Sequence, residues 1–206
     1  MTNDDQLKAI AKFWQVFQQH SDELACVSSA EDPVYDVILV QLQKVQPKLF
    51  FEFSSEAGNS ELIITADGDA SLFALVDLIV QSAPEIPGWR VIPLKPKLGF
   101  PIQTTWNGFT VTISDVVFEP MERKDSNELG LCMFLHNLSP DDIDDAHNAL
   151  LRALDHGLGE RNFAESVQHT EVHPLTDGRS SADYIPLSKL EEYINWRRKR
   201  GQGNLK

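Results

Sequence analysis

The chain has 206 residues, of which 42% are hydrophobic, and it carries a net charge of −13 from 31 acidic and 18 basic side chains. Its size is sufficient for a sizeable buried core, whereas its negative charge repels phosphate backbones and argues against a nucleic-acid partner. The acidic, polar N-terminus differs from a secretory signal, and no apolar run approaches the ~20 residues needed to cross a bilayer. We therefore expect a cytoplasmic protein without a membrane partner.

Residues 4–48 predict a pair of helices. Apolar side chains recur at helical spacing over residues 4–29, and Asp32 followed by Pro33 is typical of a capped helix start. The second helix is expected to end at Pro47.

Residues 49–95 change to the order strand–strand–helix–strand, which is a ββαβ unit. The expected elements are two strands, a helix ended by prolines and a third strand, at residues 49–53, 61–66, 72–83 and 89–94.

Residues 109–173 predict a second ββαβ unit. Its expected elements are a strand with a bulge near Asp115, a long hairpin loop, a central strand, a capped helix and a polar edge strand, at residues 109–118, 119–128, 129–136, 139–158 and 165–173. Residues 184–206 predict a closing helix, which starts with a capping-box pattern at Ser188, and a basic tail.

Together these elements predict an α+β protein, with two successive ββαβ units that form one mixed, largely antiparallel sheet in a single domain over residues 1–206. Both crossover helices should lie on one face of this sheet. The apolar strands 62–64 and 131–135 indicate that the other face is covered too, and the two N-terminal helices are the expected cover. The C-terminal helix is expected to pack on the same sheet.

Three candidate metal ligands alternate along the predicted edge strand. His169, Glu171 and His173 occupy every second position, so their side chains should point the same way. Two imidazoles and a carboxylate are suitable ligands for zinc or iron, and His136 is a candidate for a fourth. Because the pattern is permissive, we favour the interpretation of an exposed strand face without a metal, and we predict no cofactor.

Other residues with reactive side chains favour structural interpretations. Asp67 and Asp69 precede a helix, where a turn and a cap explain them without a ligand. His147 lies on the apolar stripe of its helix, as hydrogen-bonded core histidines do. Cys26 and Cys132 lack C-x-x-C spacing, so they predict no disulfide framework or zinc knuckle and are expected to be small buried hydrophobic residues.

Two stretches resemble an uncharacterised family of bacterial cytoplasmic proteins. They are Glu61–Gly68 (ELIITADG) and Ala83–Trp89 (APEIPGW), with the pairs LF and LV between them. The stretch Leu42–Phe53 (LQKVQPKLFFEF) is similar to the same family, so the resemblance covers about residues 33–95. It implies a bacterial, intracellular setting. No activity is established for that family, so no functional residue is carried over.

The chain contains no G-x-S-x-G nucleophile motif and no phosphate-binding loop. We therefore expect a non-enzymatic protein-binding module, of a regulatory or immunity type, whose acidic surface attracts a basic protein partner. The alternative is a metal-dependent hydrolase or small-ligand enzyme that uses His169, Glu171 and His173.

Overall fold

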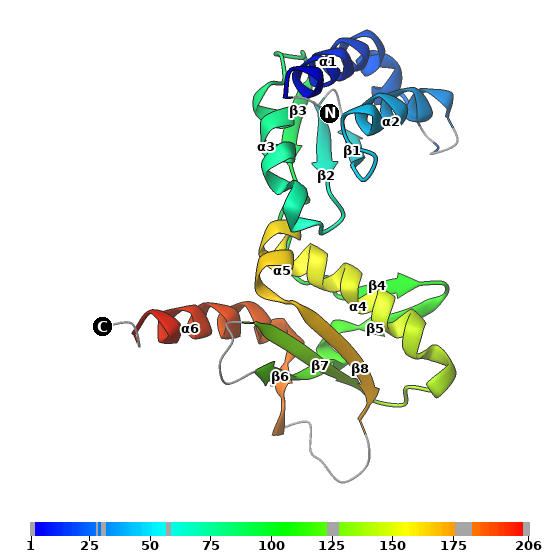
Figure 1. The fold of residues 1–206 in the computed structure, drawn as a ribbon. Coiled ribbons are helices and arrows are strands. Elements are labelled where there is room, and N and C mark those ends of the chain that lie inside the picture. Colours follow the sequence, from blue (N-terminus) through cyan, green and yellow to red (C-terminus); the bar gives the residue numbers. More distant parts are fainter. Residues whose placement is uncertain are drawn as a thin grey trace. The chain divides into compact units, whose positions relative to one another are not determined.

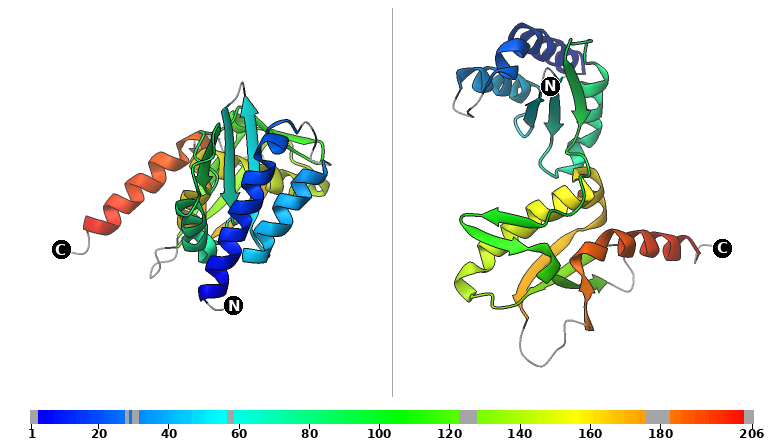
Figure 2. Two further views of the ribbon diagram at one scale, coloured as in Figure 1. Left: turned by 90° about the horizontal axis from the view of Figure 1, so that it is seen from above. Right: turned by 180° about the vertical axis from the view of Figure 1, so that it is seen from behind.

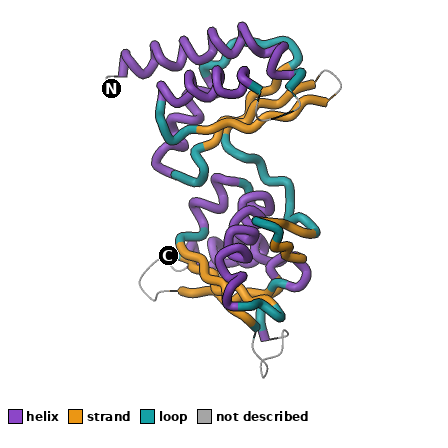
Figure 3. The backbone as a smooth tube through the Cα atoms, turned by 90° about the vertical axis from the view of Figure 1, so that its right-hand side faces the viewer, coloured by secondary structure: helices purple, strands orange, loops and turns teal. Residues whose placement is uncertain are grey.

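The computed structural model describes residues 3–27, 29, 32–56, 59–122, 128–175 and 183–203, and the chain divides into two compact units, Met1–Pro96 and Lys97–Lys206 (Figure 1). Helices pack on sheets, so the predicted α+β class is confirmed. The prediction of one sheet in a single domain over residues 1–206 differs from the structure. The described strands form a three-stranded sheet in the first unit, and a two-stranded and a four-stranded sheet in the second (Figure 3). Each ββαβ unit covers its sheet with helices of its own, so it needs no strand from the other unit.

In the first unit the described strands follow the order β1-β2-β3, with β2 antiparallel to β1 and parallel to β3. The elements of this unit are α1 (Asn3–Ala25), α2 (Pro33–Val45), β1 (Phe50–Glu56), β2 (Asn59–Thr65), α3 (Phe73–Gln81) and β3 (Trp89–Pro93). The carboxylate of Asp32 accepts a hydrogen bond from the backbone N–H of Val34, as expected for the helix start at Pro33. The predicted ββαβ order of this unit is confirmed.

The helices of the first unit lie on one face of its sheet. Phe17 of α1 packs edge-on against Trp89 of β3, with ring centroids 5.1 Å apart. Tyr35 of α2 packs against Phe51 of β1 at 4.6 Å. The indole N–H of Trp14 in α1 donates a hydrogen bond of 3.0 Å to a backbone carbonyl of α3. These contacts place α1, α2 and α3 on the same face of the sheet.

The opposite face of this sheet is open. Ile63 and Ile92 are only half-buried there, and Phe50 is 42% exposed. Glu61 and Arg90 form an ion pair across β2 and β3 on the same face. The prediction that the N-terminal helices cover this face is therefore wrong, because their aromatic side chains pack on the face that α3 occupies.

In the second unit, the larger described sheet has the strand order β8-β7-β6-β9, and a separate hairpin joins β4 and β5. The elements are β4 (Gln103–Trp106), β5 (Phe109–Thr112), β6 (Val117–Glu122), β7 (Leu129–Leu135), α4 (Ile143–Leu158), α5 (Glu160–Ser166), β8 (His169–Pro174), β9 (Ile185–Pro186) and α6 (Leu190–Gly203). The strand β7 is antiparallel to β6 and parallel to β8, so the second unit repeats the pairing of the first. Beyond this sheet, α6 extends away towards the C-terminus (Figure 2).

The stretch 109–118, predicted as one strand, forms two strands that belong to different sheets. A 3₁₀ turn at Ile113–Asp115 separates them where the bulge was expected. The first of them, β5, pairs with β4, which the sequence analysis did not predict. The second, β6, continues to Glu122, so part of the loop expected over 119–128 is strand.

The edge strand of the second unit, which was predicted over residues 165–173, is shorter in the structure. The helix α5 occupies the beginning of that range, and β8 begins at His169. Among the described strands, β8 lies at the end of its sheet and pairs with β7, so its edge position is confirmed.

The core of the second unit lies on one face of its larger sheet. Four alternate residues of β7 point into it, namely Leu129, Leu131, Met133 and Leu135. They form a buried cluster with side chains of α4 and α6, such as Leu150 and Leu190. The side chains of Cys132 and Phe134 point to the other face, which we call the open face of the second unit. At one end of this face Phe134 packs against a small buried cluster of Val117, Leu175 and Tyr184.

Candidate metal centre

The open face of the second unit brings together the three side chains that alternate along β8. His169 Nε2 lies 2.9 Å from Glu171 Oε1, and His173 Nε2 lies 2.9 Å from Glu171 Oε2. The carboxylate of Glu171 thus lies between two imidazoles, each on a different oxygen. All three side chains are partly exposed to solvent, with exposed fractions of 61%, 44% and 47% along the strand.

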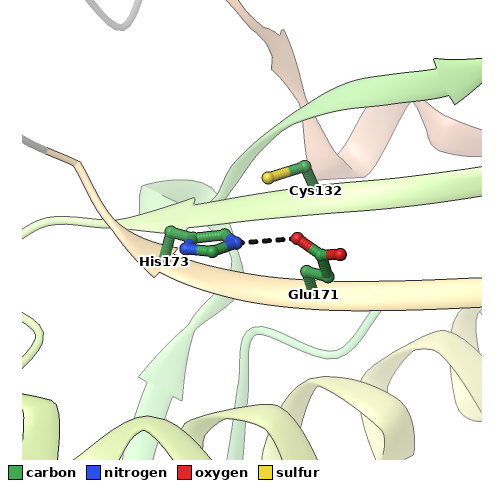
Figure 4. Close-up of side chains that lie close together, drawn as sticks. All are labelled: Cys132, Glu171 and His173. Atoms are coloured by element: carbon green, nitrogen blue, oxygen red, sulfur yellow. Dashed lines mark hydrogen bonds and ion pairs between the residues drawn. The ribbon is translucent and has the colours of Figure 1, made fainter.

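A cysteine of the neighbouring strand joins this group. The parallel register of β7 and β8 pairs Cys132 with Glu171, and paired residues of adjacent strands share a face of the sheet. One potential ligand atom from each of Cys132, Glu171 and His173 lies within 4.8 Å of the others. Figure 4 shows the thiol of β7 above the contact between the imidazole and the carboxylate of β8.

Cys132 was predicted to be a core residue and not a ligand. In the structure this cysteine is half-buried, on the face of the sheet opposite the core. The alternation of β7 contained a signal for this, because the large apolar residues at 129, 131, 133 and 135 point inward and residue 132 must then point outward. The register between β7 and β8, which brings Cys132 beside Glu171, had no counterpart in the sequence pattern.

Electrostatics distinguish the carboxylate from the thiol. Hydrogen bonds with His173 and then His169 lower the pKa of Glu171, so its carboxylate is ionised and ready to act as a ligand. Burial, followed by the negative charges of Glu171 and Glu119, raises the pKa of the Cys132 thiol. A metal ion must displace this proton, since the thiolate is the form that binds metals. The affinity for a metal is therefore expected to fall as the pH falls.

The three donor atoms form a set that Zn²⁺ accepts well. A thiolate sulfur, an imidazole nitrogen and a carboxylate oxygen are each common zinc ligands. His169, one of the three predicted ligands, is outside the group that Cys132, Glu171 and His173 form. It holds the other oxygen of Glu171, as the outer partners of metal-binding carboxylates do. His136, the suggested fourth ligand, follows the end of β7 and is also outside the group.

The other candidates have structural contacts. The carboxylate of Asp69 accepts a hydrogen bond from the backbone N–H of Ser71, which caps the turn before α3, and Asp67 forms an ion pair with Lys95. His147 Nε2 lies 2.7 Å from the hydroxyl of Thr170, and burial lowers the pKa of its imidazole.

Comparisons of the chain with protein-family models, with curated proteins and with solved structures find no match. Among the described residues, no helix combines the length and the apolar character that a membrane span requires. The inference of function therefore depends on the geometry of the open face.

Proposed function

We propose that the protein binds one Zn²⁺ ion on the open face of its second unit, through the thiolate of Cys132, the imidazole of His173 and the carboxylate of Glu171. The observation that carries the proposal is the 4.8 Å limit within which these three donors lie. Ligands of one tetrahedral zinc ion lie roughly 3.5 Å apart, given bond lengths of about 2.0–2.3 Å. Small side-chain rotations are sufficient to close the difference, because the three groups are only partly buried.

This proposal changes the metal site that the sequence suggested. The sequence-based alternative used two histidines and a glutamate from one strand, whereas the proposed site replaces His169 by Cys132 and spans two strands. A thiolate donor favours Zn²⁺ over Mg²⁺ or Ca²⁺, which bind oxygen ligands. We propose that the site binds the ion, and we propose no reaction at it.

Metal titration of the chelator-treated protein tests this site. We expect one equivalent of Co²⁺ to give the near-ultraviolet absorption band that a thiolate ligand produces, and Zn²⁺ to displace it. Cys132→Ser should abolish this band, and both Cys132→Ser and His173→Gln should weaken Zn²⁺ binding by more than ~100-fold, since even the loss of an outer partner costs roughly 10–100-fold. His169→Gln should weaken binding about 10-fold.

The chain offers a matched control in its second cysteine. Cys26 is an exposed free thiol in the first unit, so Cys26→Ser should leave the band and the affinity unchanged. An unchanged thiolate band in Cys132→Ser, or the absence of binding by the wild type, would contradict the proposal.

A second proposal concerns a protein partner, and the distribution of charge favours it. The first unit, residues 1–96, has 14 acidic and 6 basic side chains, whereas residues 97–206 have 17 and 12. We propose that the first unit attracts a basic protein, because a surface with one sign of charge steers an oppositely charged partner.

This second proposal predicts that partner capture depends on salt and on the acidic side chains of the first unit. The triple variant Asp22→Asn, Asp36→Asn, Glu85→Gln neutralises three exposed side chains there. Co-purification from the native cell at low salt should recover less of a basic protein with this variant than with wild type. A matched triple variant in the second unit, at Asp115, Asp141 and Asp144, should behave like wild type. Equal capture by all three proteins, or capture that resists high salt, would contradict the idea.

A further inference from the structure

The two units repeat one strand pairing, so their positions can be matched residue by residue. In each unit a backbone N–H beyond the last strand of the ββαβ order donates to the central strand. Leu94 donates to the carbonyl of Ile64 at 2.8 Å, and Leu175 donates to that of Leu135 at 2.7 Å. Counting along the pairings from these bonds, β1 of the first unit matches β6 of the second.

The second unit adds a strand beside β6 that has no counterpart in the described part of the first unit. Ile185 of β9 lies opposite Phe118 of β6 in an antiparallel pair, and the backbone N–H of Leu187 donates to the carbonyl of Val116 at 2.9 Å. In the first unit β1 is the outermost strand of the described sheet. The outer edge of β1 is therefore the place that β9 fills in the second unit.

The hydrogen bonds of Phe51 show that this edge of β1 can accept a strand. The carbonyl of Phe51, which matches that of Val116, accepts a hydrogen bond from the hydroxyl of Tyr35 at 3.4 Å. A side chain thus stands where the N–H of Leu187 lies in the second unit. The bond is long for an O–H···O contact, so an incoming backbone N–H can replace it. The N–H and C=O of Phe53 point to the same edge, because backbone groups alternate in direction along a strand.

The segment around β9 also covers part of the open face of the second unit. Tyr184, directly before β9, packs on Phe134 of β7 with ring centroids 4.8 Å apart. The residue of the first unit that matches Phe134 is Ile63 of β2. Ile63 is half-buried, and its diagonal neighbour on β1, Phe50, is 42% exposed. An apolar surface therefore lies beside the edge of β1, at the place that an aromatic ring covers in the second unit.

We infer that the first unit binds an extended segment of a basic partner protein, which adds a strand beside β1 and places an aromatic side chain on Ile63. Such strand addition draws its affinity from backbone hydrogen bonds and its specificity from the side chains at alternate positions. The inference rests on the second proposal above for the charge of the partner, and it names the surface on which that partner binds.

Two observations define the chemistry of the partner segment. Residues 184–187 of the second unit show that an aromatic residue fits the open face and that the aliphatic residue after it fits the edge. The first unit carries 14 acidic and 6 basic side chains, and Glu52 stands where the apolar cluster of the second unit has Val117. Lysine or arginine residues should therefore flank the apolar part of the segment.

The test measures binding of a fluorescent peptide, KKYIPLKK, to the full-length protein by anisotropy at low salt. The peptide places the sequence of residues 184–187 between lysines. We expect saturable binding of one peptide per chain. Ile63→Ala should weaken it about 5-fold through the loss of apolar contact. Phe134→Ala, at the matching position of the second unit, should leave the affinity unchanged.

Two methylated peptides form a matched pair that leaves the protein intact. N-methylation of the isoleucine removes the N–H that would donate to the carbonyl of Phe53, and it should weaken binding roughly 10-fold. N-methylation of the tyrosine changes an N–H that points away from β1, so it should have no effect.

Tyr35→Phe gives a prediction of the opposite sign. It removes the hydroxyl that the peptide must displace from the carbonyl of Phe51, so binding should become about 2–5-fold tighter. A substitution that only damaged the unit would weaken binding. Unchanged or weaker binding would contradict the pairing with Phe51.

The remaining outcomes separate the inference from the second proposal. Absence of binding, or equal binding of the two methylated peptides, would overturn the inference and leave co-purification to decide the second proposal. Weaker binding to Phe134→Ala but not to Ile63→Ala would overturn it too, because the peptide would then displace β9. A peptide with serines in place of the lysines should bind more weakly, and equal binding would contradict the attraction of a basic partner. A dimer of the peptide-free protein that Ile63→Ala dissociates would assign the surface to a second copy and overturn the inference.

Discussion

Replacing Phe118 with alanine should lower the free energy of unfolding of the second unit by about 3–5 kcal/mol, the largest effect that we expect from a single substitution. The side chain is fully buried near the start of β6, on the face covered by helices. Its ring meets Tyr193 of α6 edge-on, with centroids 5.8 Å apart, so the substitution removes an aromatic contact and also leaves a cavity.

Hydrogen exchange of the β7 amides measures this loss, because these amides should exchange only when the second unit unfolds. A probe specific to the unit is needed, since a chain with two compact units need not unfold in one step. Phe50→Ala, followed through the amides of β2 in its own unit, is the matched control, because Phe50 is 42% exposed on the open face of the first unit. It should cost less than ~1 kcal/mol, as surface substitutions usually do. Comparable losses in the two variants would show that the two phenylalanines differ less in burial than the structure indicates.

The order of the elements could be predicted from the sequence because it depends on local signals. Helix boundaries are marked by signals that span only a few neighbouring residues. Examples are the caps Asp32 and Ser139 and the prolines that end the helix before β3. The hairpin of β4 and β5 had such a signal too. Asn107 and Gly108 join these strands with positive φ angles of 46° and 86°, and Asn-Gly is a strong signal for a two-residue hairpin. The hairpin was not predicted because residues 109–118 were interpreted as one long strand.

The number of sheets could not be predicted in the same way. The pattern of apolar residues shows that a strand is buried, but it does not show which other strands lie beside it. The break at Ile113–Asp115 assigns β5 and β6 to different sheets, and the interrupted alternation near Asp115 was equally consistent with a bulge.

The candidate site was predictable only within one strand. Alternation along β8 was sufficient to place His169, Glu171 and His173 on one side. Cys132 joins this strand through a pairing that connects residues 39 positions apart in the chain. Such a register depends on the length of the crossover between the two strands, which the alternation pattern does not indicate.

The open face of the first unit leads to the second large prediction, which compares two adjacent isoleucines of β2. Ile64 is fully buried under the helices, whereas Ile63 is half-buried on the open face. Ile64→Ala should therefore lower the free energy of unfolding of the first unit by about 2–5 kcal/mol, by the loss of apolar burial and the formation of a cavity.

Ile63→Ala removes the same atoms from the neighbouring position of the same strand, so it controls for the change in strand propensity. It should cost about 1 kcal/mol, because solvent or a small rearrangement can fill the space that it leaves. Hydrogen exchange of the β2 amides compares the two variants directly. Equal losses would mean that both faces of β2 are covered, as its continuous apolar sequence predicted. A loss concentrated at Ile64 would show that the helices shield only one face, and that the apolar run Leu62 to Ile64 has one member on the exposed side.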